Sequence, residues 1–293
     1  MMRFKGVLPA LVTPLTEKEE LNGAVLNQLI EHLLAQGADG FYIGGATGEG
    51  IALNEETRRR LAEESVRAVG GRKPCILHVA SADFNEAVRL ARHAENCGAA
   101  AISAIPPLFF RYDKDDVYHY YKKLAEAVHI PLMVYYNPNA GFAIDADFAA
   151  RLFEIENVTA IKWTSPDYYG MLRLRDRTHG EMNIINGPDE MLLMGLAAGA
   201  DGGIGTTYNI QLPTIRRIYD SFIQGDTDTA RAAQIQADRV INSLLKRPTI
   251  PATKAALEQM GFAVGNAAFP MKRFDEAEKK QLFQELLEAG LEQ

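Results

Sequence analysis

Short apolar runs alternate with longer amphipathic patterns along most of this chain. Runs rich in β-branched and aromatic residues predict strands, and apolar positions spaced by three or four residues predict helices. The predicted strands cover residues 6–14, 40–44, 74–80, 99–105, 131–137, 158–165, 183–186 and 201–205. The predicted helices cover residues 22–36, 54–69, 84–97, 114–128, 144–155, 168–179, 189–198 and 213–224.

Eight successive strand–helix units predict parallel strands with right-handed crossovers, and eight such strands close a barrel. We therefore predict an α/β fold, a (β/α)8 TIM barrel, over residues 1–225. Residues 226–293 contain helical patterns only, which predicts a C-terminal helical extension packed on the barrel. An open doubly wound sheet is disfavoured because no G-x-G-x-x-G element follows the first strand.

Composition narrows the class of protein. Hydrophobic residues make up 47% of the chain and charged residues 24%, which is typical of a soluble globular protein. The net charge of −7 without a basic patch argues against nucleic acid as a partner. Cys75 and Cys97 lack the spacing of a disulfide framework or a zinc site. We see neither a signal peptide nor a membrane-spanning run, so we expect a cytoplasmic protein without a membrane partner.

Lys162 is the most informative candidate residue, because it interrupts the apolar run at 158–165. Lysine is almost never buried in such a strand unless it is paired or functional. Loss of water disfavours the charged form of a lysine, and a neutral amine attacks ketones to form Schiff bases. The alternative is that Lys162 lies at the strand end and its ammonium reaches water.

Other candidates follow the predicted strands, where such barrels gather their chemistry. Only one of Tyr135 and Tyr136 can point into the barrel, and a phenol near a Schiff-base lysine can relay protons. The sequence GGATGEG at 44–50 is not a P-loop, but its backbone amides suit a carboxylate if it is more than a tight turn. Asp189 and Glu190 either accept hydrogen bonds from ligand hydroxyls or cap a helix.

The six histidines are scattered, and no pair has metal-ligand spacing. We therefore expect no metal, and imine chemistry is favoured over Lewis-acid chemistry. His78 lies within a predicted strand and is expected to belong to the core.

The order and spacing of GGATGE at 44–49, Tyr136-Asn137 and Lys162 resemble the dihydrodipicolinate synthase and N-acetylneuraminate lyase family. The resemblance covers nearly the whole chain, including KAAL at 254–257. It implies a metal-free class I aldolase without a cofactor, usually a homotetramer. It assigns the Schiff-base lysine to Lys162, the proton-relaying tyrosine to Tyr136, and carboxylate binding to Thr47 and the amide of Ala46.

Within the family, the motifs after strands six to eight resemble the sialic acid lyase branch. This implies that Asp189 and Glu190 bind the polyol tail of a sugar, with Thr164 and Thr206 adding to that site. Residues singled out by these motifs are Thr164, Gly187, Asp189, Glu190, Gly205 and Thr206. The synthase branch carries an arginine shortly after the Tyr-Asn pair, and YNPNAGF at 136–142 has none.

Two departures from the family pattern concern hydroxyl groups. Ala46 stands where the family usually has Ser or Thr. Phe109 and Phe110 stand where the family supplies a tyrosine across a subunit interface, and Tyr112 substitutes only if the loop is rebuilt. The hydroxyl relay that joins these groups to Tyr136 is therefore incomplete.

We predict a carbon–carbon lyase that cleaves N-acetylneuraminate to pyruvate and N-acetylmannosamine through a Schiff base. The alternatives are an aldolase for another 2-oxo-3-deoxy sugar acid, an enzyme like dihydrodipicolinate synthase, and a non-catalytic sensor of pyruvate or sialic acid. The expected partners are the small-molecule substrates and the other subunits of a homotetramer.

Overall fold

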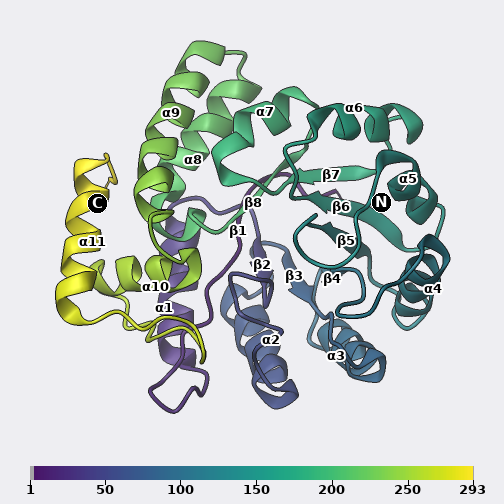
Figure 1. The fold of residues 1–293 in the computed structure, drawn as a ribbon, viewed down its shortest axis with the longest axis horizontal. Coiled ribbons are helices and arrows are strands. Elements are labelled where there is room, and N and C mark those ends of the chain that lie inside the picture. Colours follow the sequence, from purple (N-terminus) through teal and green to yellow (C-terminus); the bar gives the residue numbers. More distant parts are fainter. Residues whose placement is uncertain (1–2, 293) are drawn as a thin grey trace.

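The computed structural model describes residues 3–292, so the outermost ends of the two predicted domains, residues 1, 2 and 293, lie outside it. Within this range eight parallel strands form one sheet in the order β1-β8-β7-β6-β5-β4-β3-β2. A parallel bridge between Ala10 and Tyr42 brings the two ends of the sheet together. The result is a nearly closed barrel surrounded by helices (Figure 1).

The strands are short and every residue in them is buried. They are β1 (Gly6–Pro9), β2 (Phe41–Ile43), β3 (Cys75–His78), β4 (Ala101–Ala104), β5 (Leu132–Tyr136), β6 (Val158–Trp163), β7 (Asn183–Asn186) and β8 (Gly202–Gly205). Burial on both faces is expected for parallel strands that are covered by helices. It also explains why their sequences are largely apolar rather than alternating between apolar and polar residues.

One helix or helical pair follows each strand, and most helices begin at an Asn or Asp that accepts a hydrogen bond from the first turn. They are α1 (Gly23–Ala35), α2 (Glu55–Val69), α3 (Phe84–Asn96), α4 (Lys114–Ala125), α5 (Ala146–Phe153), α6 (Tyr168–Arg177), the 3-10 turn η1 (Asp189–Met191), α7 (Leu192–Ala197) and α8 (Tyr208–Ile223). The predicted (β/α)8 TIM barrel is confirmed.

Three elements differ from the sequence-based prediction by more than a few residues at their ends or by a division. The first strand ends at Pro9 rather than residue 14, and the chain beyond it forms only the bridge at Ala10. The helix predicted at 189–198 is divided into η1 and α7. Helix α8 begins at Tyr208 instead of 213 because the turn before Pro213 is helical and joins the rest through a kink at Gln211.

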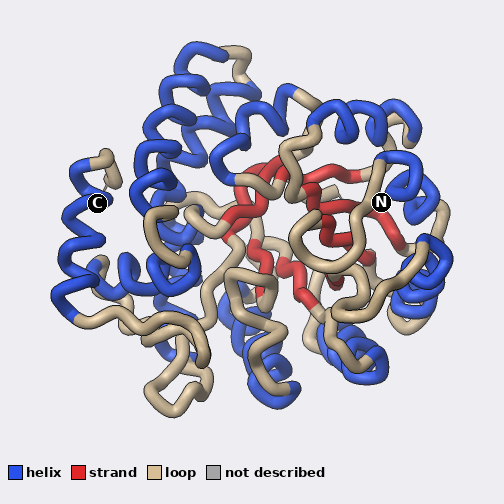
Figure 2. Tube along the Cα trace, in the orientation of Figure 1, coloured by secondary structure: helices blue, strands red, loops and turns tan. Residues whose placement is uncertain are grey.

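The C-terminal segment consists of α9 (Thr227–Leu244), α10 (Thr249–Gln259) and α11 (Glu276–Glu288). Helices α9 and α10 pack against α8, and α11 packs on α9 and α10, all at one side of the barrel (Figure 2). The C-terminal helices agree with the predicted extension, while the division of the chain at residue 225 stays a prediction. Over residues 3–292, no helix combines the length and the hydropathy that crossing a membrane requires.

Candidate active site

The register of the strands determines which side chains fill the barrel. Tyr135 on β5 lies opposite Lys162 on β6, so both side chains point to the same side of the sheet. The Lys162 ammonium lies 4.3 Å from the centre of the Tyr135 ring and 5.0 Å from that of Tyr42 on β2. Because β2 and β6 are on opposite sides of the barrel, these contacts show that Lys162 points inward. Its residue surface is only 6% exposed.

Tyr136 does not face Lys162, contrary to the expectation from sequence. It is paired with Trp163 in the register, and the two rings pack edge to face with centroids 4.8 Å apart. Side chains alternate along a strand, so Tyr136 points toward the surrounding helices when Tyr135 points inward. Burial raises the pKa of the Tyr136 phenol. The phenol beside Lys162 therefore belongs to Tyr135.

The loop after β2 brings Thr47 to the mouth of the barrel. The Thr47 hydroxyl lies 2.6 Å from the hydroxyl of Thr206, which follows β8, so these two predicted site residues are in direct contact. Thr47 is buried, whereas the neighbouring Ala46 is exposed. The loop packs so tightly that a side chain on Gly50 would collide with the carbonyl of Gly44, which explains its glycines.

Thr164 and Gly187, which follow β6 and β7, are also in contact. The Gly187 amide donates to the carbonyl of Trp163, and a Cβ on Gly187 would collide with the Thr164 hydroxyl. That hydroxyl is buried and has no hydrogen-bond partner among the residues described. An unpaired buried hydroxyl is a group that a ligand can satisfy.

Asp189 is engaged by the protein itself. Its Oδ2 accepts hydrogen bonds from the amide and the hydroxyl of Thr207, both at 2.7 Å. Burial raises the pKa of Asp189 to about 6. A side chain on Gly205 would collide with Asp189 and Tyr208, so the closeness of β8 to η1 requires glycine there. Glu190, by contrast, is exposed.

A pocket of about 410 Å³ opens at the C-terminal ends of β2 to β5. Its walls are largely apolar and include Ala46, Ile105, Leu108 and Met271, with Tyr135 and His78 among them. Thr164, Gly187, Asp189, Glu190 and Thr206 lie after the strands on the other side of the barrel and do not line this pocket. Of the predicted residues, Ala46 borders this pocket, whereas Lys162, Thr47 and Tyr136 are not among its lining residues.

Sequence analysis missed His78 and Tyr42 as members of this interior. His78 was expected in the core, and it is buried, but it also lines the pocket. Side chains alternate along β3, so the orientation of His78 follows once the direction of one other β3 side chain is known. That direction comes from the register of the sheet, which the sequence alone does not give.

The loop after β4 presents the two aromatic residues that depart from the family pattern. Phe109 is 94% exposed and Phe110 is 69% exposed, while Tyr112 packs with its ring 6.3 Å from that of Phe110. Phe109 has a φ of 77°, a backbone conformation that is uncommon for a bulky residue.

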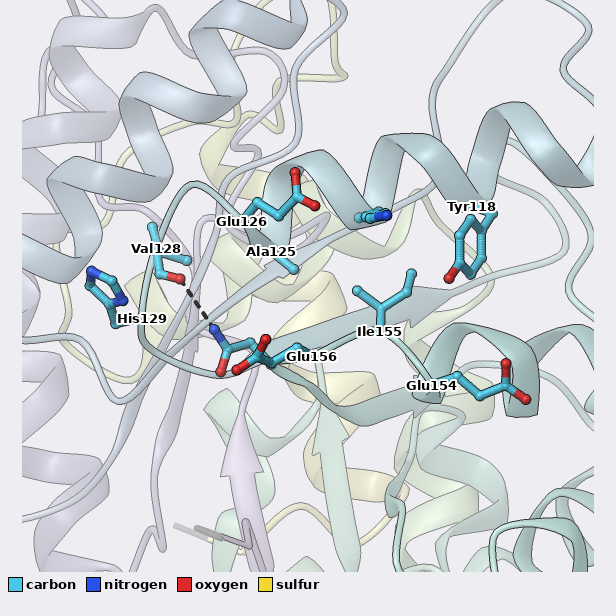
Figure 3. Close-up of a pocket in the computed structure, with 10 residues that line it drawn as sticks. Tyr118, Ala125, Glu126, Val128, His129, Glu154, Ile155 and Glu156 are labelled. Carbon is cyan, nitrogen blue, oxygen red and sulfur yellow. Dashed lines mark hydrogen bonds between the residues drawn. The ribbon is translucent and has the colours of Figure 1, made fainter.

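A second hollow, of about 450 Å³, lies at the opposite end of the barrel. It is lined by the end of α4 and by the loops that precede β5 and β6, with Glu126 and His129 before β5 and Glu154 and Glu156 before β6 (Figure 3). The N-terminal end of barrel strands is associated with stability rather than catalysis, so this hollow is not the candidate active site.

One group of possible metal ligands occurs among residues 3–292. Glu63 on α2, His93 on α3 and Cys97, which directly follows α3, bring ligand atoms within 4.8 Å of one another. Sequence reasoning found no such grouping because the residues come from two helices. The group lies on the outer helices and not at the barrel mouth.

The chain matches the model of the dihydrodipicolinate synthetase family over residues 3–289. An N-acetylneuraminate lyase of Rhizobium meliloti is 34% identical over 279 residues, which are 94% of this chain and 92% of that protein. The structure of Proteus mirabilis N-acetylneuraminate lyase is similar with a TM-score of 0.95, 29% identity and coverage of 99% and 100% of the two chains. A dihydrodipicolinate synthase of Bacillus anthracis gives a TM-score of 0.93, 26% identity and coverage of 98% and 99%.

The match to the family model and the alignment with the Rhizobium meliloti protein both cover nearly the whole chain. The chain therefore belongs to the dihydrodipicolinate synthetase family. It is an enzyme, a carbon–carbon lyase.

Proposed function

We propose that this member of the family is a class I aldolase that cleaves N-acetylneuraminate to pyruvate and N-acetylmannosamine. The observation that carries the proposal is the pairing of Lys162 and Tyr135 inside the barrel, with the ammonium 4.3 Å from the ring centre. Lys162 is 6% exposed, and no carboxylate lies within ion-pair distance of it among residues 3–292, so no counter-charge holds its nitrogen away from a bound ketone.

The chemistry begins at Lys162. Its amine adds to the C2 ketone of the substrate, water leaves, and the protonated imine becomes an electron sink. The electron pair of the C3–C4 bond then moves into the imine to give an enamine, and C4 becomes the aldehyde carbon of N-acetylmannosamine. Protonation of the enamine at C3 and addition of water release pyruvate and restore the amine.

Tyr135 is the proposed proton relay in place of Tyr136. Its hydroxyl accepts the proton of the C4 hydroxyl while it gives its own to the substrate carboxylate, so that no net charge forms on the phenol. General acid–base transfer of this kind contributes roughly 10²- to 10⁴-fold to the rate. The position of Tyr135 in the same interior as Lys162 supports this role.

The substrate carboxylate is proposed to bind at the loop after β2, through the amides of Ala46 and Thr47 and the Thr47 hydroxyl. The contact between Thr47 and Thr206 supports a site that joins the two sides of the barrel mouth. The polyol tail is then directed toward Thr164, Asp189, Glu190 and Thr206. Gly187 and Gly205 allow these groups to approach one another because they carry no side chain.

A second candidate is an aldolase for a shorter 2-oxo-3-deoxy sugar acid. It is favoured by Asp189, which uses one carboxylate oxygen to hold Thr207 and so has less capacity for a long polyol. A synthase of the dihydrodipicolinate type is less favoured, since no arginine occurs at 136–142 to hold a second carboxylate.

Release of pyruvate from a panel of sugar acids distinguishes these candidates. We expect the highest kcat/KM with N-acetylneuraminate, and a decrease with that substrate alone when Glu190 is changed to Gln. A preference for a shorter acid would favour the second candidate. Binding without release of pyruvate from any acid would favour a sensor.

We further propose that the enzyme is a cytoplasmic homotetramer. The strongly exposed rings of Phe109 and Phe110 support a contact between copies at the loop after β4. Light scattering coupled to size exclusion tests the number of subunits, and a monomer at micromolar concentration would contradict this proposal.

A further inference from the structure

His78 is the polar side chain at the end of β3 that points into the barrel. It pairs with Ser103 in the register, and the Ser103 hydroxyl contacts the Tyr42 hydroxyl at 3.0 Å within the barrel. The His78 ring lies between two aromatic neighbours, with centroids 6.3 Å from Tyr42 and 6.1 Å from Tyr135. His78 is therefore in the same interior as the phenol proposed to relay protons.

Neither ring nitrogen of His78 has a well-aligned hydrogen-bond partner among residues 3–292, although the ring lies close to the Gly44 backbone and the residue is only 6% exposed. The hydroxyls of Tyr42 and Ser103 are paired with each other, which leaves them less free to serve the imidazole. Native proteins rarely leave buried polar atoms unpaired, because each one loses its hydrogen bonds to water. The missing partner is expected to come from what occupies the pocket.

His78 is one of the residues that line the pocket, so a ligand in the pocket lies next to this side chain. The same pocket is bordered by Ala46 in the predicted carboxylate loop and by Tyr135. Most of its other wall residues are apolar, so few side chains there compete for a polar ligand. His78 and Tyr135 thus face the same space from two strands.

The imidazole of His78 remains uncharged in this environment. Burial lowers its pKa to about 3, with further lowering from the positive charges of Arg58 and Lys162, while a contact with the Gly44 backbone acts in the opposite direction. Arg58 donates a hydrogen bond to the His78 carbonyl at 3.1 Å, so its charge is fixed close to the residue. A neutral imidazole has one N–H donor and one acceptor nitrogen.

The loop after β2 offers few side-chain donors for an anion. Ala46 contributes none, and the Thr47 hydroxyl is shared with Thr206. Strands β2 and β3 are neighbours, with Ile43 opposite Leu77, so the residues that follow them are adjacent. His78 is thus a buried side chain next to this loop, and its ring nitrogens have no well-aligned partner among the residues described.

We propose that the His78 imidazole donates a hydrogen bond from one ring nitrogen to the carboxylate of the 2-oxo acid bound at Lys162. This inference rests on the proposed function and adds a residue to the carboxylate-binding part of the site. It assigns His78 to binding the substrate, whereas Lys162 forms the covalent bond.

The test measures how pyruvate concentration controls trapping at Lys162. The amine and the ketone form an imine with loss of water, borohydride transfers hydride to the imine carbon, and the product is a stable secondary amine. In His78→Phe, which keeps a ring without donors, the half-saturating pyruvate concentration is expected to rise by roughly 10- to 100-fold, the effect of losing a hydrogen bond to a charged group. If this variant does not fold, His78→Met replaces it.

Pyruvamide separates binding of the carboxylate from a general change of shape, because it keeps the ketone but has no negative charge. We expect the His78 variants to change its half-saturating concentration by less than about threefold, since a neutral partner gains less from the donor. His32→Leu is the matched control: His32 on α1 also has a buried, unpaired Nε2, but it packs on Phe262 away from the barrel interior. It should behave as the wild type with both ligands.

Two results would overturn this inference without affecting the proposed function. The first is a half-saturating pyruvate concentration in His78→Phe that stays within about twofold of the wild-type value. The second is an equal rise in the half-saturating concentrations of pyruvate and pyruvamide. Failure of the wild type to form any adduct would instead overturn the proposed function, and the inference with it.

Discussion

Lys254 and Glu49 form an ion pair that is enclosed on all sides, with Nζ 2.8 Å from Oε1 and side chains that are 1% and 0% exposed. The other oxygen of Glu49 accepts the amide of Ala268, and Lys254 also donates to the carbonyl of Asn266. Glu49 has a φ of 59°, a left-handed conformation that costs energy for a residue with a side chain. The C-terminal segment therefore holds the loop that carries Thr47 in place through this ion pair and its hydrogen bonds.

Removing one member of this pair should be strongly destabilising. In Lys254→Met the Glu49 carboxylate is left buried without a counter-charge, and we expect the free energy of unfolding to fall by about 3–5 kcal/mol. Urea denaturation measures the change. The double variant with Glu49→Gln should recover part of the loss, because no unpaired charge remains.

Lys272→Met is a suitable control for this prediction. It breaks an ion pair with Glu278 whose side chains are 44% and 39% exposed, and such pairs contribute about 1 kcal/mol or less. Equal destabilisation by Lys254→Met and Lys272→Met would show that the buried pair does not hold the loop.

The two adjacent tyrosines allow a direct comparison of positions. Tyr135→Phe should lower kcat by roughly 10²- to 10⁴-fold, because the relay hydroxyl is lost while the ring still packs beside Lys162. Tyr136→Phe, which removes a hydroxyl on the helix-facing side, should keep kcat within about threefold of wild type. Steady-state kinetics with N-acetylneuraminate measures both. The opposite ranking would return the relay to Tyr136.

Asp189 should make stability depend on pH. Burial raises its pKa to about 6, above the value of about 3.9 for an unfolded chain. Between these values the folded state binds more protons than the unfolded state, so the stability contributed by the protonated carboxyl is lost as pH rises through about 6. A difference of roughly two units corresponds to about 3 kcal/mol between pH 4 and pH 7.

Urea denaturation at both pH values checks this sign. The amide in Asp189→Asn cannot titrate. The free energy of unfolding of this variant should therefore fall less between pH 4 and pH 7 than that of the wild type. Asp228→Asn, at a side chain that is 89% exposed, should retain the wild-type decrease. Parallel pH profiles for wild type and Asp189→Asn would contradict the raised pKa.

The barrel could be predicted from sequence because strands buried on both faces are continuous apolar runs, and each is followed by a helix with one apolar side. The boundaries were less certain where local rules compete. Helix α8 was predicted to begin at Pro213, yet the preceding turn is also helical and the kink lies at Gln211. A proline is compatible with a helix there because the first turn of a helix does not need its amide.

The sequence was sufficient to predict that the candidate site lies at the ends of particular strands. It was not sufficient to predict which side chains there point into the barrel. Lys162 was recognisable because a lysine is exceptional in an apolar strand. Tyr135 and Tyr136 could not be separated, since a shift of one residue in register exchanges the two faces. The partnership of Glu49 with Lys254 spans 205 positions in the chain, and only the packed tail brings the two residues together.

The central claim is that Lys162 forms an imine with pyruvate, and borohydride trapping followed by peptide mass mapping tests it most directly. We expect an adduct on the peptide that contains Lys162, and no adduct in Lys162→Arg. The buried Lys254 should stay unmodified, because Glu49 pairs with its ammonium. The account would be contradicted if the folded wild-type protein formed no adduct on the Lys162 peptide at saturating pyruvate. It would also be contradicted if the adduct formed on another lysine instead.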